Sequence, residues 1–474
     1  MDMTETQRIL LHLRRNYRAP MSLPEIVETE IKRFVSSTEY EQMAEAEQYY
    51  RNRSAVQNKI NDIEKRSNTK IERPIIKKLI DQKINYTLSR PFSISSDNKE
   101  YNAALNGVFD DQVRQKIKRF GRGAPRLSKG WMIPFITEKG KLDFRVVPAT
   151  NLIPFWTDEE HTDLQGFLYF YNVTIYDGYV ARNIINAEWW DTTGILYFTN
   201  EHGQFQADPE RPGKHAHFTV DEKPYNWTVP PIVWCKYNDE ELPLQYFMKE
   251  MVDDVNWQNS VTADVLRDVA KFLWVVKNYG GADLAEFVDG LRKYLAIKVE
   301  GDGGVDTIQP SPQIAAVLEF IDNTRRDIYD LGAGVDTKDP NLGSASGKAM
   351  YFRYMDLDND SAALQSEIKA AFLRLKIFLD DYFVLTGRGQ FYDDAYQITF
   401  NTDMPVDEPE IFQNAQIARN IGVSLRTILE NLPWIKDVET EMARIAQERE
   451  DERTRQEAEL ARMAPFDFPA EGDD

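Results

Sequence analysis

Apolar residues recur every three or four positions along much of this 474-residue chain, a spacing typical of amphipathic helices. In residues 244–271, for example, Met251 and Val255 would share one face, while polar side chains occupy the others. Ser22, placed just before a proline and a glutamate, is typical of a helix N-terminus. The pattern predicts helices within residues 1–60 and over 68–90, 244–271, 312–329, 347–386, 410–420, 425–432 and 438–462.

From Trp131 to Tyr237 the pattern changes to short alternations of apolar and polar residues. These segments are rich in aromatic and β-branched side chains, which favour strands. Turns that contain glycine, such as Glu138-Lys139-Gly140, separate them. The pattern predicts an antiparallel sheet, so the N-terminal half is expected to be an α+β body.

Residues 272–310 predict a small strand–helix–strand cassette between two long helical stretches. About 40 residues cannot bury a useful core alone, so the cassette is expected to pack on neighbours, first of all on other copies of itself. Within it we expect strands at 272–276, 296–300 and 305–308, a helix at 283–294 and a turn at 301–304.

Residues 331–346 read LGAGVDTKDPNLGSAS and carry no helical or strand pattern. A connection of this length between two helices is uncommon in a compact domain, and such loops are usually functional or disordered. Both interpretations, a functional loop and a flexible surface connection, fit the sequence. The C-terminal residues 463–474 are short and acidic, and they are expected to be disordered.

The formal net charge is −20, which argues against a protein that holds nucleic acid tightly, because such proteins need a basic surface. The charge does not argue against a channel through which DNA slides. No apolar run approaches 18 residues, which excludes a membrane span, and the N-terminus lacks the features of a signal peptide.

The chain has one cysteine, Cys235, in the apolar run 231–236. One cysteine excludes a disulfide framework and a cysteine-based zinc site, and an intracellular origin fits this usage. We expect Cys235 to be a small buried hydrophobic residue rather than a reactive thiol.

Two motifs suggest ligand chemistry, and each has a plainer interpretation. The glycines of 301–304 lack a following lysine and hydroxyl residue, so they predict a hairpin turn rather than a phosphate-binding loop. His215 and His217 would share a strand face and could hold a metal ion. The other three histidines offer no obvious third ligand, so exposed strand histidines are the better interpretation.

Three acidic segments could likewise bind a metal ion or act in catalysis, and each again has a plainer structural interpretation. Residues 356–367 place carboxylates where a calcium loop has them, but Ser361 stands where that loop needs glycine, which favours the polar face of a long helix. Asp253–Asp254 and Asp239–Glu241 could be general acid–base pairs. No nucleophile or histidine accompanies them in a shared motif, so solvated helix faces are the expected role. The sequence therefore predicts neither catalysis nor a metal site.

The run KNYGGADLAEFVDGLRKYLAIKVEGDGGVDT, residues 277–307, resembles part of the portal proteins of tailed double-stranded DNA bacteriophages, specifically the siphophage branch. SASGKAM, residues 344–350, is similar to the family's Ser/Thr-Gly-x-Ala start of a long helix. YTLSRPF, residues 86–92, fits a step that follows an early helix in this family, and residues 422–445 look like its crown segment.

The resemblance implies an α+β portal fold in a cyclic oligomer, a dodecamer in this family. Its parts would be a wing (1–243), a stem helix (244–271), a clip (272–310), a return stem helix (311–330), a tunnel loop (331–346), a long wing helix and strand (347–404), crown helices (405–462) and a disordered tail (463–474).

The resemblance further implies a ring at one capsid vertex, through which double-stranded DNA is packaged and ejected without regard to sequence. The expected partners are the terminase large subunit, the scaffolding and major capsid proteins, and later the head–tail adaptor proteins. The protein would be a virion component assembled in the host cytoplasm, with no enzymatic activity, cofactor, metal or membrane. Two other classes stay open at this point: a soluble enzyme with a regulatory helical tail, and another scaffold or adaptor protein.

Two groups of site residues follow from the resemblance. DNA-channel residues in and beside the tunnel loop would be Val335, Asp336, Lys338, Asp339, Asn341 and Lys348. Partner-docking residues of the clip would be Lys277, Asn278, Tyr279, Glu286, Arg292, Lys293 and Asp302. The lysines of the loop could make weak phosphate contacts that do not depend on sequence.

Overall fold

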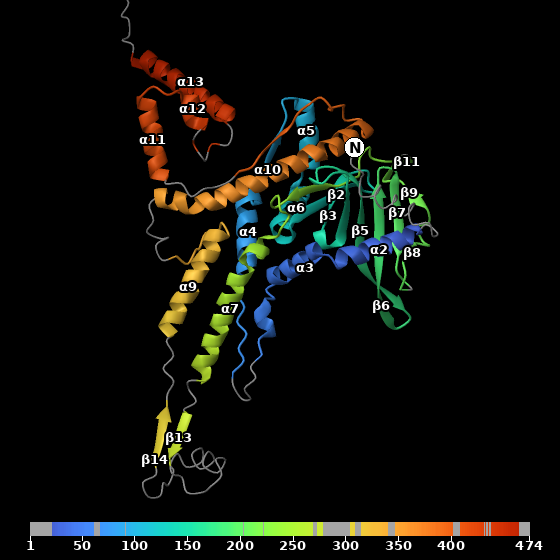
Figure 1. The fold of residues 1–474 in the computed structure, drawn as a ribbon. Helices are drawn as coiled ribbons and strands as arrows, with labels where there is room; N and C mark the ends of the chain where they lie inside the picture. The colour runs from blue at the N-terminus through green and yellow to red at the C-terminus, as the bar shows by residue number, and fades with distance from the viewer. Residues whose placement is uncertain are drawn as a thin grey trace, which may run out of the picture. The chain divides into compact units, whose positions relative to one another are not determined.

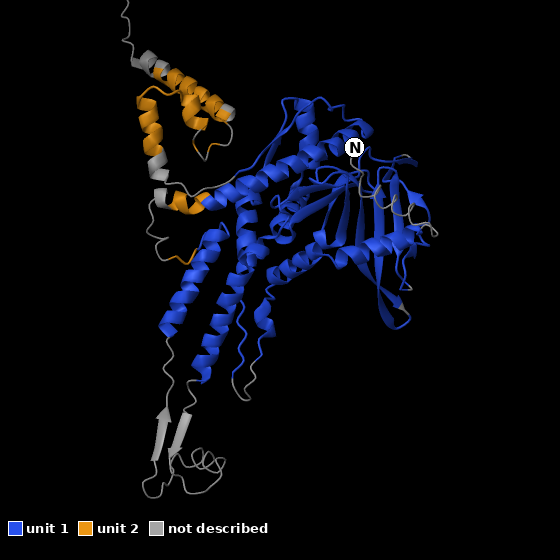
Figure 2. Cartoon of the chain, in the orientation of Figure 1, with its two compact units in different colours: residues 1–336, 356–402 blue, residues 337–355, 403–474 orange. Residues whose placement is uncertain are grey.

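A computed structural model of the chain describes residues 21–60, 67–90, 92–201, 203–220, 222–268, 273–277, 304–308, 314–339, 347–401, 408–430, 432, 435 and 438–463. The chain divides into two compact units, blue and orange in Figure 2. Unit 1 comprises residues 1–336 and 356–402, and unit 2 comprises residues 337–355 and 403–474. Helices and sheets both occur in unit 1, which confirms the predicted α+β class.

Two antiparallel sheets lie in unit 1 and confirm the prediction for residues 131–237 (Figure 1). The larger has six strands in the order β4–β5–β6–β7–β8, with β9 also paired to β7, and the smaller has three in the order β12–β2–β3. Their bounds are β2 Lys129–Ile136, β3 Leu142–Val147, β4 Leu152–Trp156, β5 Leu164–Asp177, β6 Val180–Asp191, β7 Gly194–Thr199, β8 Gln206–Ala207, β9 Lys214–His215 and β12 Val233–Lys236.

Three short two-stranded ladders complete the strands. They pair β1 (Ser93–Ser95) with β15 (Gln397–Thr399), β10 (Phe218–Val220) with β11 (Lys223–Tyr225), and β13 (Leu273–Lys277) with β14 (Gly304–Ile308). The β13–β14 ladder is antiparallel and confirms the first and last strands of the predicted cassette. The predicted helix 283–294, strand 296–300 and turn residues 301–303 lie outside the described residues.

Most helices agree closely with the predicted ranges, but α5 and α6 were not predicted, and α4 begins at Ile75 rather than at 68. The described helices are α2 Leu23–Val35, α3 Thr38–Tyr50, η1 Ala55–Asn58, α4 Ile75–Leu88, α5 Lys99–Val108, α6 Asp111–Leu127, η2 Ala149–Asn151, α7 Leu244–Asp268, α9 Ile314–Leu331, α10 Gly347–Leu385, α11 Glu408–Asn420, α12 Leu425–Glu430 and α13 Val438–Met463. Ser22 caps α2 as predicted, because its hydroxyl and backbone form a capping box with Glu25.

Helix α10 provides much of the core of unit 1. Its predicted apolar set is buried throughout, with no side chain more than 3% exposed: Leu357, Leu364, Ile368, Ala371, Leu375, Leu379 and Tyr382. All of them except Leu357 belong to one hydrophobic cluster with side chains of α4, α5, α6 and α7. The acidic segment 356–367 lies within α10, which confirms its interpretation as part of a long helix.

Helices α5 and α6 were not predicted from the sequence. Asp110 caps α6 by accepting a hydrogen bond from the backbone N–H of Val113 at 2.9 Å. Gly121, Gly123 and Pro125 in the last turns of α6 hide its helical pattern. The first two glycines are needed because α6 closely approaches its neighbours: a Cβ on Gly123 would lie 2.8 Å from a backbone atom of β2.

Of two predictions about single side chains, the buried Cys235 is confirmed and the exposed His217 is wrong. Cys235 is fully buried, as predicted, and burial raises the pKa of its thiol. The expectation of exposed histidines is wrong for His217, which stacks on Trp190 with ring centroids 5.7 Å apart and accepts the Trp227 N–H at 3.0 Å. Burial lowers the pKa of His217 to about 4, so its ring is neutral at pH 7. His215 is exposed, as expected.

Candidate functional site

The two stem helices predicted from the sequence, α7 and α9, form an antiparallel pair in unit 1 (Figure 1). At 1.5 Å per residue, the 25 residues of α7 span about 38 Å. Both helices lead into the β13–β14 ladder, the described part of the predicted clip. The chain thus runs along α7 to the ladder and back along α9, with a long helix on each side of the cassette as predicted.

An extended segment, residues 67–73, lies along α7, and we call it the strap. The backbone N–H groups of Thr69, Ile71 and Arg73 donate hydrogen bonds to side chains one helical turn apart. The acceptors are Asp264 at 2.7 Å, Ser260 at 2.9 Å and Asn256 at 3.1 Å. Alternate residues of an extended chain and every fourth residue of a helix are spaced by similar distances, which makes this ladder possible. The ladder ties the strap to the stem.

A buried ion pair lies beside this ladder. The Lys59 ammonium contacts the Asp264 carboxylate, and their side chains are only 6% and 12% exposed. Ser67 also donates to Asp268, from its hydroxyl at 2.9 Å. The acids on this side of α7 are therefore bound within the chain. The prediction that Asp253 and Asp254 are solvated is wrong for Asp253, which accepts a hydrogen bond from the Tyr49 hydroxyl at 2.6 Å. Asp254 is exposed, as predicted.

The free faces of the two helices differ in chemistry. Helix α9 exposes four acids at spacings that place them on one side: Glu319, Asp322, Asp327 and Asp330. The same helix exposes one arginine, Arg326, so acids outnumber bases on its surface. Helix α7 exposes a mixed aromatic and acidic stripe formed by Tyr246, Phe247, Glu250, Asp254 and Trp257. The exposed face of α9 would repel phosphate, and that of α7 carries enough aromatic surface to pack on another protein.

The chain that follows α9 contains the predicted channel loop. Two glycines terminate α9: the backbone N–H of Gly332 donates to the Ile328 carbonyl at 3.0 Å, and that of Gly334 donates to the Tyr329 carbonyl at 2.8 Å. Val335 is 3% exposed, so the start of the loop packs against the rest of unit 1. Helix α9 includes Leu331, the first residue of the predicted loop, and residues 332–339 carry no helix or strand, as the sequence predicts.

The remaining predicted channel residues fall into three groups. Asp336 is largely buried and pairs with Arg325 at 3.3 Å, which directs its carboxylate back toward α9. Lys338 is exposed, and Asp339 pairs with Arg353 of unit 2. Asn341 lies outside the described residues, as does the side chain of Lys348. Their contact with DNA stays a prediction.

Of the predicted clip residues, only the backbone of one is described. Lys277 is the last residue of β13, where it pairs with Gly304. The other six lie outside the described residues: Asn278, Tyr279, Glu286, Arg292, Lys293 and Asp302. The docking role of all seven stays a prediction.

A charged cluster joins the two sheets to the start of α7. The Glu241 carboxylate contacts Lys129, whose side chain is 3% exposed, and also His161 at 2.8 Å and Lys236 at 3.2 Å. Burial alone would raise the pKa of Glu241, but its contacts with His161 and Lys129 outweigh burial and lower it to about 2. The prediction of a solvated acid at 239–241 is therefore wrong for Glu241.

Replacing Glu241 with glutamine is expected to destabilise the chain at pH 7 by about 2–3 kcal/mol, because the pKa falls from 4.5 to about 2 on folding. A lowered pKa contributes stability above pH 4.5, and this contribution disappears as the pH falls toward 2. Wild type and Glu241→Gln should therefore differ most at pH 7 and converge near pH 2. Denaturation midpoints measured across this range test the prediction, and a constant difference would contradict it.

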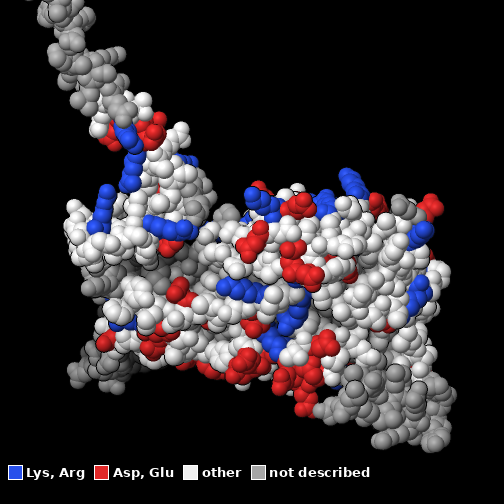
Figure 3. Space-filling model, turned by 90° about the horizontal axis from the view of Figure 1, so that it is seen from above, with Lys and Arg blue, Asp and Glu red and all other residues white. Residues whose placement is uncertain are grey.

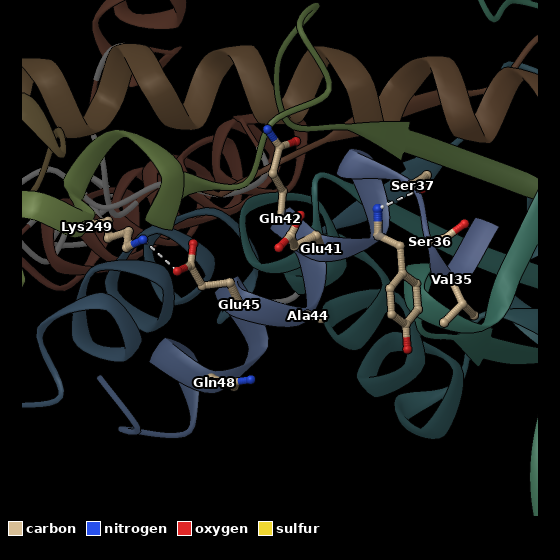
Figure 4. A pocket seen from close by; sticks show the side chains of 10 residues that line it. Val35, Ser36, Ser37, Glu41, Gln42, Ala44, Glu45, Gln48 and Lys249 are labelled. Atoms are coloured by element: carbon tan, nitrogen blue, oxygen red, sulfur yellow. Dashed lines mark hydrogen bonds and ion pairs between the residues drawn. The ribbon is translucent and has the colours of Figure 1, made fainter. Parts of the chain in front are cut away.

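A surface hollow of about 700 Å³ lies where α2 meets α3, near the start of α7 (Figure 4). Its lining is polar, and Lys249 forms an ion pair with Glu45 across it at 2.7 Å. No nucleophile–base pair is among its lining residues. Across the described ranges, no three His, Cys, Asp or Glu side chains are grouped to hold a metal ion, and none of the described helices is long and apolar enough to cross a membrane.

Acidic and basic side chains are interspersed over the described part of the face drawn in Figure 3. This distribution agrees with the net charge of −20 and differs from the continuous basic surface of proteins that hold nucleic acid tightly.

An α+β body from which two antiparallel helices lead into a small two-stranded sheet is the architecture expected of a portal-type assembly protein. The chain matches the family model described as "Phage portal protein, SPP1 Gp6-like" over residues 34–455. It belongs to this family of phage portal proteins, which are structural proteins of the virion rather than enzymes. The two alternative classes considered from the sequence are therefore set aside.

Two curated relatives support the assignment. The chain is 28% identical to the portal protein of Bacillus phage SPP1 over 383 residues, which cover 78% of this chain and 74% of that protein. It is 25% identical to the portal protein of Clostridium phage phiCD119 over 428 residues, which cover 84% of this chain and 90% of that protein.

Proposed function

We propose that this portal protein forms a closed ring, a dodecamer, at one capsid vertex, and that double-stranded DNA enters and leaves the head through its axial channel. The family match carries the proposal, and the exposed acidic face of α9 supports it. An acidic wall does not hold phosphates, so the duplex can slide. In this arrangement α7 and α9 line the channel, and the aromatic stripe of α7 packs against a neighbouring copy.

The proposed ring binds different partners through the clip and through the wing. The terminase large subunit supplies the ATP hydrolysis that drives packaging, and head–tail adaptor proteins replace it once the head is full. Both dock on the clip, residues 272–310, while scaffolding and major capsid proteins contact the wing, residues 1–243. In this proposal residues 405–462, which include α11, α12 and α13, would form the crown. The ring is assembled in the host cytoplasm and stays in the virion.

Electron microscopy of the purified full-length chain tests the proposal. We expect closed rings with a wide axial hole, viewed both end-on and from the side. Monomers or dimers at micromolar concentration, filaments, or rings without an axial hole would each overturn it.

Replacing Lys338 with alanine is expected to reduce the amount of DNA packaged per head, while ring assembly stays normal. Lys338 is exposed in the channel segment, and it would make a phosphate contact that does not depend on sequence. The measurement is the length of protected DNA in heads assembled with the variant. Lys139→Ala, in an exposed turn of the wing, is the matched control. Normal packaging by Lys338→Ala rings would contradict a role for this loop in DNA contact.

A further inference from the structure

One turn of α4 contacts two parts of the chain that are far apart in sequence. Gln82, Lys83 and Tyr86 of this turn form hydrogen bonds with residues 333–335, just after α9, and with residues 358–360 of α10. We call these three residues the α4 clamp. Both contacts lie within unit 1, close to the points where the chain leaves it, after Asp336, and returns to it, at Asp356.

Gln82 holds Val335 by two hydrogen bonds. The Val335 N–H donates to Gln82 Oε1 at 3.0 Å, and Gln82 Nε2 donates to the Val335 carbonyl at 3.2 Å. The side-chain amide thus binds both polar groups of one residue, much as a neighbouring strand would. Close packing supports the contact, because a Cβ on Gly334 would lie 2.4 Å from Leu79 of the same helix.

Lys83 joins the two segments directly. Its side chain is 1% exposed, and its ammonium donates to the Ala333 carbonyl at 3.1 Å and to Asp360 at 2.8 Å. Burial lowers the pKa of Lys83, and the Asp360 carboxylate opposes this effect. Loss of Asp360 would leave the buried ammonium without its counter-charge, and loss of the Ala333 carbonyl would remove one of its hydrogen-bond acceptors.

The α10 side of the clamp has further contacts. Tyr86 donates its hydroxyl to Asp358 at 2.9 Å, and Tyr237 donates to Asp360 at 3.1 Å. The carboxylates of 356–367 that resemble a calcium loop are therefore partly used to bind α4. Their role explains why acids occur in this part of a long helix.

We propose that Gln82, Lys83 and Tyr86 are positioning residues that anchor both ends of the segment 337–355, so that the channel residues beyond Asp336 start from a fixed point. The anchoring itself follows from the contacts of unit 1. Its consequence for DNA rests on the proposed function.

Hydrogen exchange of the full-length chain tests the anchoring. Gln82→Leu keeps the size of the side chain and removes both bonds to Val335, so exchange of the Val335 amide should rise by about tenfold or more. Lys83→Met should increase exchange of residues 333–335 and of 356–361 together, because it releases both segments. Lys77→Met, an exposed lysine of the same helix, is the matched control and should change neither region.

Three outcomes separate anchoring from ordinary packing and from the proposed function. Unchanged exchange at Val335 in Gln82→Leu overturns the anchoring. Faster exchange at Val335, together with normal DNA packaging by Gln82→Leu rings, overturns the positioning role. Faster exchange in a protein whose wild-type form makes no ring supports the anchoring and overturns the proposed function instead. If Gln82→Leu does not fold, Gln82→Glu keeps the acceptor for the Val335 N–H, loses the donor, and should raise exchange by a smaller factor.

Discussion

Replacing Asp264 with alanine is expected to destabilise the chain by about 3–5 kcal/mol and to release the strap from α7. The substitution leaves Lys59 as a buried charge without its carboxylate, and it removes the acceptor of the Thr69 N–H. Denaturant midpoints of the full-length chain measure the loss, and hydrogen exchange of residues 67–73 shows whether the strap is released.

Two further variants make this prediction specific. Asp254→Ala removes an exposed acid from the same helix and should change stability by no more than about 0.5 kcal/mol. The double variant Lys59→Met with Asp264→Asn removes both charges and keeps an acceptor for Thr69, so it should recover much of the loss. A stability for Asp264→Ala equal to that of Asp254→Ala would show that the buried pair contributes little.

Replacing Gly130 with alanine is expected to cost about 3 kcal/mol or more, or to prevent folding. A Cβ at this position of β2 would lie 2.2 Å from the Phe120 carbonyl oxygen of α6 and 3.0 Å from the Cys235 sulfur. The first of these atoms is backbone and cannot rotate away, so α6 would have to move from the sheet. The soluble yield and denaturant midpoint of the full-length variant provide the measurement.

Gly107→Ala is the matched control for Gly130. Gly107 lies in α5, where the nearest atom to an added Cβ is an Arg388 side-chain nitrogen at 3.5 Å, an ordinary contact. Alanine favours a helix over glycine, so this variant should be neutral or stabilised by up to about 1 kcal/mol. A similar loss in both variants would mean that the close approach of α6 to β2 is not the cause.

The strap and the α4 clamp explain how a long helical stem can be held in one chain. Each uses polar side chains on one helix to satisfy backbone groups of an irregular segment, which would otherwise be unpaired when buried. Contacts of this kind fix the position of a segment more narrowly than apolar packing does, because hydrogen bonds are directional.

Elements with strong local signals were predicted well from the sequence. The start of α7 at Leu244, the end of α10 near Thr386 and the Ser22 cap all depend on residues within one or two turns. The buried set of α10 follows from a spacing that only one helix face satisfies. Helix α6 was missed because its glycines allow close packing that the sequence does not reveal: a Cβ on Gly121 would lie 2.7 Å from the Leu88 side chain, and one on Gly123 would lie 2.8 Å from the backbone of β2.

The candidate site was predicted less completely. The resemblance of residues 277–307 and 344–350 identified the family, and the family model confirms it. The loop after α9 was predicted, but the burial of Val335 was not, because Gln82, which binds its backbone, lies more than 250 residues earlier in the chain. Glu241 was expected to be a solvated acid for the same reason, since its partner His161 lies 80 residues earlier in the chain.

The sequence by itself determined the class of fold, the positions of the long helices, the burial of Cys235 and the portal family, because each depends on local periodicity or on a continuous motif. Only the tertiary structure decided which polar residues of α4 and α7 are exposed and which bind a distant segment. The physical reason is that a carboxylate or an amide has the same neighbours in the sequence whether it is exposed or buried. Its role depends on the partner that folding brings to it.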